Sequence, residues 1–410
     1  MAQYVMDLFG SCLSCFPGTP ALRINRYSLK ISRLLGEVQK PSHLKHHEKA
    51  VQDINTEALY ALKKIRCSFG QESVSLAMKE VEAYKLFAPY PNIIQCIDYS
   101  ISSDRSDPGV KTVYILLPYY RRGNLQDIIN ANLVNHTSFP EKQLMVLFLG
   151  VCRALKAMHN FGESNNQREN NGNKKMNRRN NSSDLSVNQE INTESEQKDG
   201  TRETKDRAFE SEQQKLLSDE GLAPHHEENL PSKVEAYAHR DIKPGNIMID
   251  DDGEQPILMD LGSISPSPIA ITSRSIALAV QDTAAEHSTM PYRAPELFDV
   301  KTGCNIDTKV DIWSLGCTLY ACLVGKSPFE MRSDETGGSL SICVLSGDWR
   351  FPDEGTGDKK AKNKAVVEPR SEINESIREV VRKCLKVEPT ERPDVNELIT
   401  MTEDIIAKFS

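Results

Sequence analysis

Apolar residues recur along the chain at spacings that predict both strands and helices. Residues 25–64 predict several short strands, of which "LYALKKI" (59–65) is the clearest. Residues 72–87 predict an amphipathic helix, because apolar residues repeat there at three- and four-residue steps. Pro89 and Pro91 end this helix. Its apolar face comprises Val74, Ala77, Met78, Val81 and Tyr84.

Longer apolar runs predict the elements of a buried core. The run "TVYILLPYY" (112–120) predicts a buried strand that stops at a proline. The run "EKQLMVLFLGVCRALKAMH" (141–159) predicts a long helix, and its apolar character on all sides predicts that the helix is buried. From residue 303 onward the pattern is helical, and it closes with "NELITMTEDIIAKF" (396–409).

The pattern is interrupted between residues 160 and 235, where Asn, Glu, Ser, Lys and Gln replace the large apolar residues. Such a segment buries too little surface to offset the entropy lost on ordering, which predicts a disordered insertion in a folded domain. Its basic start, "KKMNRR" (174–179), and its acidic remainder would suit a docking segment, but the composition favours a solvated tether. A second polar loop of this kind is predicted at about residues 353–371.

The bulk composition narrows the class of protein. A chain of 410 residues has room for one large domain or two ordinary ones. The net charge of −8 argues against a general nucleic-acid binder. Ten cysteines without a pairing pattern indicate a reducing compartment, and only Cys12 and Cys15 are close together. We find neither a secretory signal nor an apolar run of the roughly 20 residues that would span a membrane.

The most informative stretch is "AHRDIKPGNIMID" (238–250), which places Asp241, Lys243 and Asn246 in one short loop before a strand. Phosphoryl transfer needs a carboxylate that orients the attacking hydroxyl and accepts its proton. It also needs oxygen ligands for Mg²⁺ and a cation near the transferred phosphoryl group. The loop supplies all three groups, and "LMDLGS" then places Asp260 before a glycine turn, where it suits the second metal contact.

These motifs continue in a fixed order with "PYRAPE" (291–296), "DIWSLG" and "ERP". Each alone has an ordinary structural interpretation, but their order and spacing argue against coincidence. The chain resembles the protein kinase superfamily, and "DIKPGN" resembles its Ser/Thr form. The resemblance covers nearly all of residues 25–405 outside the insertion.

The resemblance implies an α+β, bilobal kinase fold that uses ATP and Mg²⁺ to phosphorylate protein substrates. It implies a leader over residues 1–24, an N-lobe over about 25–117 and a C-lobe over about 121–408, with the insertion in the C-lobe. Asp241 would be the catalytic base, Asn246 and Asp260 would bind the metal, and Lys243 would steady the γ-phosphate. Thr289 would hydrogen-bond to the catalytic loop, while Glu296 and Arg392 would form a structural pair.

The N-lobe must supply a lysine for the α- and β-phosphates and a helix glutamate that holds it. Lys63 and Glu80 fit this pattern. The competing residues are Lys64, which strand alternation places on the opposite face, and Glu82, which lies roughly 200° further around the helix. Within "LLPYYRRGNLQD", Leu117 would be the gatekeeper, and the backbone from Pro118 to Tyr120 would face adenine.

A narrower resemblance is to the Numb-associated kinase family, and within it to the small lipid-anchored branch. It rests on "ILMDLGS", with DLG in place of the usual DFG, and on "SLGCTLYACLVGKSPFE" and the long activation segment. Members carry an extra helix in that segment, which "SIALAVQDTAAEHS" (275–288) would form. The polar insertion resembles fungal members. The family implies Ser/Thr phosphorylation of proteins linked to membrane traffic.

The glycine-rich loop departs from the family pattern, which reads roughly G-E-G-G-F-S-x-V. Gly36 and Glu37 fit, but Val38 and Pro41 occupy the next motif positions. Valine resists the backbone angles that let N–H groups approach phosphate, and proline has no N–H to offer. Three interpretations remain open: an active kinase with weakened ATP affinity, a pseudokinase scaffold, or a stretch 38–50 that comes from a gene-model error such as a translated intron.

The leader "VMDLFGSCLSCFPG" carries Cys12 and Cys15 among apolar residues. A zinc knuckle lacks a second Cys/His pair, and a redox motif lacks its strand–helix–strand context. Palmitoylation fits the family, and two acyl chains give stable anchoring. Residue 2 is alanine, so the N-myristoylation signal is missing. We therefore expect a cytoplasmic protein held peripherally on Golgi or vacuolar membranes, while its oligomeric state is not predicted.

Overall fold

The computed structural model describes residues 22–38, 44–68, 70–103, 109–162, 236–354 and 373–409. The chain divides into two compact units. The sheet unit runs to Val81 and resumes over Gln95–Tyr119, and the helical unit comprises Glu82–Ile94 and Tyr120–Ser410.

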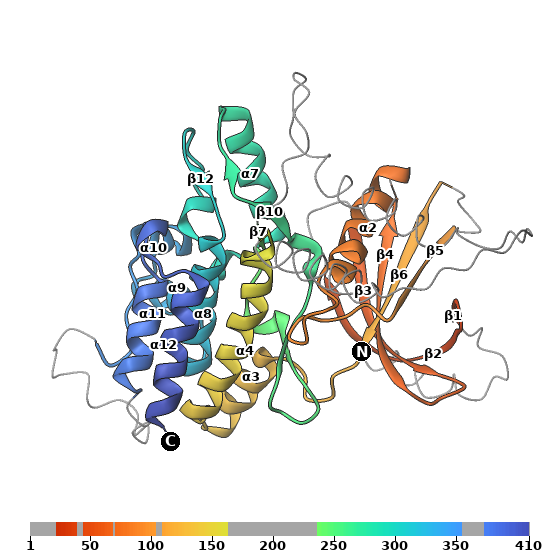
Figure 1. The fold of residues 1–410 in the computed structure, drawn as a ribbon, viewed down its shortest axis with the longest axis horizontal. Coiled ribbons are helices and arrows are strands. Elements are labelled where there is room, and N and C mark those ends of the chain that lie inside the picture. Colours follow the sequence, from red (N-terminus) through yellow and green to blue (C-terminus); the bar gives the residue numbers. More distant parts are fainter. Residues whose placement is uncertain are drawn as a thin grey trace, which may run out of the picture. The chain divides into compact units, whose positions relative to one another are not determined.

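The sheet unit is built on six antiparallel strands in the order β1-β2-β3-β4-β6-β5 (Figure 1). β2 and β3, with 12 and 10 residues, are longer than the short strands predicted for this region. Side chains from alternate positions of the strands meet on one face, where Leu29, Val51, Leu62 and Leu116 form a buried core. The strands are β1 (Leu22–Ile24), β2 (Tyr27–Val38), β3 (Leu44–Asp53), β4 (Leu59–Cys67), β5 (Asp98–Ser103) and β6 (Lys111–Pro118).

The predicted amphipathic helix is confirmed as α2 (Gly70–Leu86). Of the residues predicted for its apolar face, Val74, Ala77, Val81 and Tyr84 are buried, whereas Met78 is only half-buried. The spacing of apolar residues was therefore sufficient to locate this helix and the face that it buries.

The atypical glycine-loop segment contributes to the β2–β3 hairpin. Gly36 pairs with Glu48, Glu37 with His47 and Val38 with His46, after register shifts between Ile31 and Arg33 and between Leu34 and Gly36. Pro41 lies outside the described residues. A backbone ladder tolerates a β-branched residue such as Val38, so the hairpin continues where the glycine pattern is lost.

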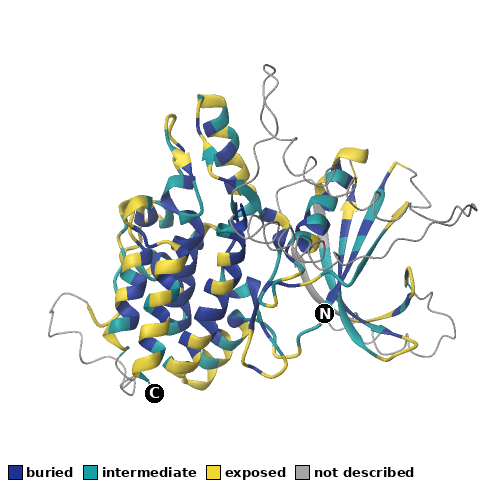
Figure 2. Cartoon of the chain, in the orientation of Figure 1, coloured by how far each residue is buried: buried dark blue, intermediate teal, exposed yellow. Residues whose placement is uncertain are grey.

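The helical unit is dominated by α-helices, and the buried helix predicted over 141–159 is confirmed as α4. Figure 2 shows buried residues concentrated on α4 and α8, the two helices of this unit with the most buried residues. The α-helices of this unit are α3 (Leu125–Asn135), α4 (Glu141–His159), α7 (Arg274–His287), α8 (Lys309–Val324), α9 (Pro328–Thr336), α10 (Leu340–Ser346), α11 (Glu375–Cys384) and α12 (Val395–Lys408).

Close approach of α8 and α11 depends on a small residue. A Cβ on Gly316 of α8 would lie 2.5 Å from the Cβ of Cys384 of α11. Both the helix around Gly316 and the thiol of Cys384 are buried, so the two helices have no room to separate there without opening the core. This contact sets the spacing at the centre of the unit.

The segments between these helices contain three pairs of short antiparallel strands. β7 (Ala236–Ala238) pairs with β10 (Ser265–Ser267), and β8 (Ile247–Ile249) pairs with β9 (Pro256–Leu258). β11 (Ile269–Ala270) pairs with β12 (Asn305–Ile306). The β8–β9 hairpin therefore follows directly after the motif "DIKPGN" and leads back to "LMDLGS".

The described fold extends past residue 160, where the polar insertion was predicted to begin. Phe161 is buried and packs edge-on against Phe87 and Tyr237, with ring centroids 5.8 and 5.1 Å away. This residue therefore belongs to the fold and not to the polar segment that was predicted from residue 160. Three predicted segments lie outside the described residues: the rest of the insertion (163–235), most of the second polar loop (355–371), and the leader with Cys12 and Cys15. Within the described ranges, each helix is too short or too polar to cross a bilayer.

Candidate active site

A buried aspartate on α8 holds the loop that follows β7. Asp311 accepts backbone hydrogen bonds from His239 N and Arg240 N, each at 2.8 Å. His159 Nε2, at the end of α4, lies 2.9 Å from Asp311 Oδ2. Burial pushes the pKa of Asp311 upward, but the His159 hydrogen bond and nearby charges outweigh it, so that the pKa lies below its usual value. Arg240 has a left-handed φ of 70°, which this support stabilises.

The loop presents the carboxylate of Asp241, which is only 3% exposed. Its Oδ1 accepts hydrogen bonds from Thr289 N at 2.9 Å and from Thr289 Oγ1 at 2.6 Å. Its Oδ2 accepts from Lys243 Nζ at 2.8 Å and from Asn246 Nδ2 at 3.1 Å. The structure therefore brings three of the residues selected from the sequence, Lys243, Asn246 and Thr289, around one buried acid.

Lys243 connects two parts of this cluster. Its Nζ donates to Thr289 Oγ1 at 2.7 Å as well as to Asp241. The Lys243 side chain is 27% exposed, whereas that of Asp241 is 3% exposed. Of the two, the lysine is the group that can exchange a protein partner for a bound anion.

Asn246 and Asp260 supply oxygen donors that suit Mg²⁺. Within the described part of the chain, the hydrogen bonds of the Asn246 side chain use Nδ2, which donates to Asp241 O at 2.8 Å and to Asp241 Oδ2 at 3.1 Å. The amide oxygen is left to face a ligand. Met259 N donates to Asn246 O at 2.9 Å, which places Asp260 one residue beyond this contact. Asp260 itself is in the left-handed conformation, with φ 55° and ψ 70°. Magnesium is commonly held by one or two side-chain oxygens together with substrate phosphates, and this donor set fits it.

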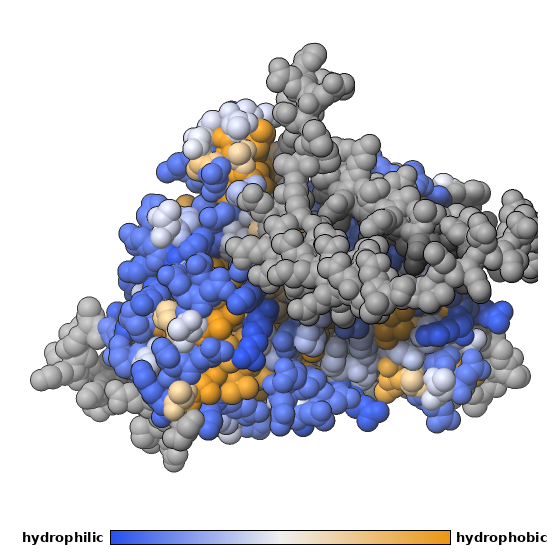
Figure 3. Space-filling model, viewed as in Figure 1, coloured by the Kyte–Doolittle hydropathy of each residue, from blue (hydrophilic) through white to orange (hydrophobic). Residues whose placement is uncertain are grey.

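The extra helix predicted in the activation segment is present as α7, and it leads into the cluster. Ser288 caps the helix, and Thr289 follows directly. Arg293 is 8% exposed and donates from Nε to Ser288 Oγ at 2.7 Å. In Figure 3 apolar side chains are visible at α7, where Leu278 is 45% exposed.

In the sheet unit, Lys63 and Glu80 form the ion pair expected from their spacing. Lys63 Nζ lies 2.6 Å from Glu80 Oε1, and the two side chains are 4% and 7% exposed. On β4, Lys63 lies on the face opposite to that of Leu62 and Lys64, and it is buried whereas Lys64 is half-buried. Glu82 is half-buried on α2.

The predicted hinge begins in the last residues of β6 and continues beyond the strand. Leu117 is buried and pairs with Ala61 of β4, and Pro118 pairs with Tyr60. Tyr120 begins the helical unit, where burial raises the pKa of its hydroxyl and the charges of Asp250 and Asp251 add to the effect. Gly36, the remaining predicted nucleotide contact, is described only by its backbone pairing in β2.

Glu296 and Arg392 form the predicted structural pair. Arg392 donates from Nη1 and Nη2 to the two carboxylate oxygens of Glu296 at 2.7 and 2.8 Å. The Arg392 side chain is fully buried, and its guanidinium lies 5.0 Å from the ring centroid of Trp313. A bidentate pair of this kind fixes geometry as well as charge.

Sequence reasoning did not find the support for the catalytic loop. Asp311 stands in "DIWSLG", a motif that was noted without a role for the aspartate, and it lies 72 positions from His239. His159, Arg293 and Ser263, whose Oγ donates to His239 O at 2.7 Å, were also missed. A charged residue inside an otherwise apolar helix was the available signal for Asp311.

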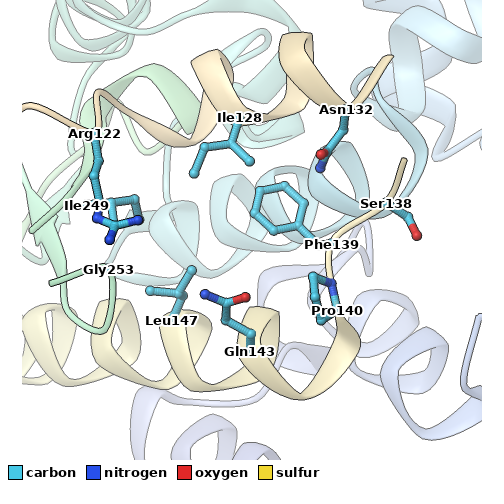
Figure 4. A pocket seen from close by; sticks show the side chains of 10 residues that line it. All are labelled: Arg122, Ile128, Asn132, Ser138, Phe139, Pro140, Gln143, Leu147, Ile249 and Gly253. Atoms are coloured by element: carbon cyan, nitrogen blue, oxygen red, sulfur yellow. The ribbon is translucent and has the colours of Figure 1, made fainter. Parts of the chain in front are cut away.

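A separate pocket of about 240 Å³ lies in the helical unit, and its lining shares no residue with the cluster around Asp241. Figure 4 shows the Phe139 ring between Ile128 of α3 and Leu147 of α4, with Gln143 alongside. Arg122 and Gly253 close one side. This pocket does not explain the chemistry of the motifs.

A β-rich unit with a buried lysine–glutamate pair, and a helical unit with an Asp–Lys–Asn loop and a DLG turn, define the protein kinase class. The sequence model of the protein kinase domain family matches residues 220–402 of this chain. Serine/threonine-protein kinase ENV7 of Saccharomyces cerevisiae is 33% identical over 411 residues, covering 99% of this chain and 100% of the relative.

Two further relatives agree with this class. Serine/threonine-protein kinase ppk13 of Schizosaccharomyces pombe is 32% identical over 402 residues, covering 98% of this chain and 94% of the relative. Serine/threonine-protein kinase 16 of Rattus norvegicus is 29% identical over 354 residues, with coverage of 86% and 84%. The chain belongs to the serine/threonine protein kinase family, and the predicted α+β kinase fold is confirmed.

Proposed function

We propose that this protein is an active kinase, which transfers the γ-phosphate of ATP to serine and threonine hydroxyls of proteins. The observation that carries the proposal is the buried Asp241 carboxylate within hydrogen-bond distance of Lys243, Asn246 and Thr289. Residues from separate motifs donate hydrogen bonds to this one carboxylate. Burying a charged group costs free energy unless it is paired, and buried titratable groups of this kind cluster at functional sites.

The roles follow from the contacts of each side chain. Asp241 orients the acceptor hydroxyl and takes its proton, because its carboxylate is fixed by Thr289. Lys243 moves from Asp241 toward the γ-phosphate, since its side chain is partly exposed. Asn246 and Asp260 would hold Mg²⁺ through their oxygens, and the ion would neutralise phosphate charge. Lys63, oriented by Glu80, would bind the α- and β-phosphates of ATP.

The altered glycine-loop segment is the reason to keep a second candidate function. Val38 ends β2 where the family pattern has glycine, and Pro41 cannot donate an N–H. We therefore propose that this chain binds ATP more weakly than its relatives do. If binding were lost altogether, the protein would act as a pseudokinase scaffold. A gene-model error over residues 38–50 remains the third interpretation, and sequencing the transcript tests it.

A narrower placement, in the small lipid-anchored branch of the Numb-associated kinases, is supported by "LMDLGS" and by α7 in the activation segment. With it we propose a cytoplasmic protein anchored by acylated Cys12 and Cys15 on Golgi or vacuolar membranes, where its substrates belong to membrane traffic. Changing both cysteines to serine should release the protein from membranes. Unchanged membrane recovery after that change would rule the anchor out.

The direct test of the proposed function is a transfer assay with the purified full chain. We expect labelled phosphate to pass from Mg·ATP to a generic protein acceptor. Asp241→Asn should lower the rate by about 10²- to 10⁴-fold, because the general base is lost. Equal rates for the two proteins would show that the transfer does not come from this site.

A further inference from the structure

The C-terminal end of α7 is followed by the residue that hydrogen-bonds to the proposed catalytic carboxylate of Asp241. Ser288 closes the helix, since its N donates to Ala284 O at 3.0 Å and its Oγ donates to the same oxygen at 2.6 Å. Thr289 follows, and both its N and its Oγ1 donate to Asp241 Oδ1. Any shift of Ser288 is therefore transmitted directly to two of the four donors that fix Asp241.

Arg293 fastens this end of the helix. Its Nε donates to Ser288 Oγ at 2.7 Å, and its Nη2 donates to Ser288 O at 3.0 Å and to Ala285 O at 3.4 Å. The guanidinium also lies 4.9 Å from the ring centroid of Phe298, which holds its plane. The last carbonyls of a helix have no partner within the helix, and a guanidinium fork satisfies them at the negative end of the helix dipole.

The burial of Arg293 shows that this contact is selective. The side chain is removed from water, which lowers its pKa, while the nearby charge of Asp241 acts in the opposite direction. A lysine at this position could not reproduce the planar fork, because its single ammonium group cannot reach three acceptors in the same geometry. The site therefore requires a guanidinium and not only a positive charge.

We propose that Arg293 is a positioning residue for phosphoryl transfer, which acts through Ser288 and Thr289 to orient the Asp241 carboxylate. The proposal rests on the proposed function and adds a role that the kinase motifs do not give to this arginine. It also gives a role to the C-terminal end of α7 alone, which is the fixed point from which Thr289 reaches Asp241.

The test compares Arg293→Lys, Ser288→Ala and the control Thr283→Ala in the full chain. Thr283 is exposed in the middle of α7, and its Oγ1 makes the same kind of bond, to Ala279 O at 2.7 Å. We expect Arg293→Lys to lower kcat about tenfold or more, because small misplacements of a reacting group are costly. The KM for ATP should stay within about twofold, since only the position of the base changes.

Ser288→Ala should lower kcat by a smaller factor, and it should add little when combined with Arg293→Lys, because both changes break the same contact. Thr283→Ala should leave kcat unchanged. The proposal is overturned if Arg293→Lys retains kcat, if the two changes multiply independently, or if the control loses as much activity as Arg293→Lys.

Hydrogen exchange separates this proposal from the proposed function. The amide of Thr289 should exchange faster in Arg293→Lys than in the unchanged chain or in Thr283→Ala, whether or not the protein transfers phosphate. A chain without transferase activity but with this exchange pattern would refute the kinase proposal and leave the Arg293 contact in place. Equal exchange in all three proteins would overturn the role of Arg293.

Discussion

The catalytic loop of the helical unit and the β2–β3 hairpin of the sheet unit belong to one kinase domain, yet their sequences obey different constraints. The Asp241 carboxylate is fixed by several hydrogen bonds, and Asp311 accepts hydrogen bonds from the backbone N–H groups of His239 and Arg240. In the hairpin the glycine pattern breaks after Glu37 while the backbone ladder continues through Val38. We therefore expect the chemical step and the binding of ATP to be separable in this protein.

The difference follows from what each region must do. A strand ladder needs only paired N–H and C=O groups, which almost every residue provides. A phosphate loop needs N–H groups free to face an anion at angles that glycine reaches most easily. The hairpin can consequently lose its function while it keeps its fold, whereas substitution of Asp241 would remove the function without needing to disturb the fold.

The largest effect should come from Asp260→Asn in the helical unit. Loss of one carboxylate weakens the hold on the metal, and we expect a rate lower by about 10³-fold, which corresponds to several kcal/mol of transition-state stabilisation. Raising the Mg²⁺ concentration should recover part of the loss. If Asp260→Asn transferred phosphate as fast as the unchanged chain, Asp260 would not hold the metal. The contrast between the catalytic loop and the hairpin would then not extend to the metal site.

A smaller loss should follow from breaking the Lys63–Glu80 pair in the sheet unit. We expect Lys63→Met to reduce kcat/KM for ATP by about 10²-fold, since it removes a positioned cation from the phosphates. It should also destabilise the protein by about 3 kcal/mol, because Glu80 is left buried without this partner. Thermal melting of Lys63→Met beside Lys63→Met/Glu80→Leu measures this cost, which the double change should reduce. A double variant no more stable than the single one would contradict it.

The smallest effect is expected from restoring glycine in the hairpin. Val38→Gly combined with Pro41→Gly should lower the KM for ATP by about three- to tenfold, which corresponds to the net value of one ordinary hydrogen bond. The kcat should not change, because Asp241 and its partners are untouched. Titration of initial rates against ATP concentration gives both constants. A change in kcat with constant KM would show that the two regions are not separable.

The sequence located the features whose residues lie close together in the chain. Asp241, Lys243 and Asn246 were found because phosphoryl transfer requires them at short spacing. The α2 helix was found from apolar periodicity, α4 from a long apolar run, and α7 from the resemblance to a kinase family. What was missed depends on contacts between distant segments. The support from Asp311 crosses 72 positions, and Phe161 is part of the fold only because Phe87 and Tyr237 pack against it.

The most direct measurement is the steady-state rate of phosphate transfer by the full chain as ATP is raised into the millimolar range. The account predicts saturation at a high KM and a kcat about 10²- to 10⁴-fold above that of Asp241→Asn. A rate that remains equal to that of Asp241→Asn at every ATP concentration would contradict it.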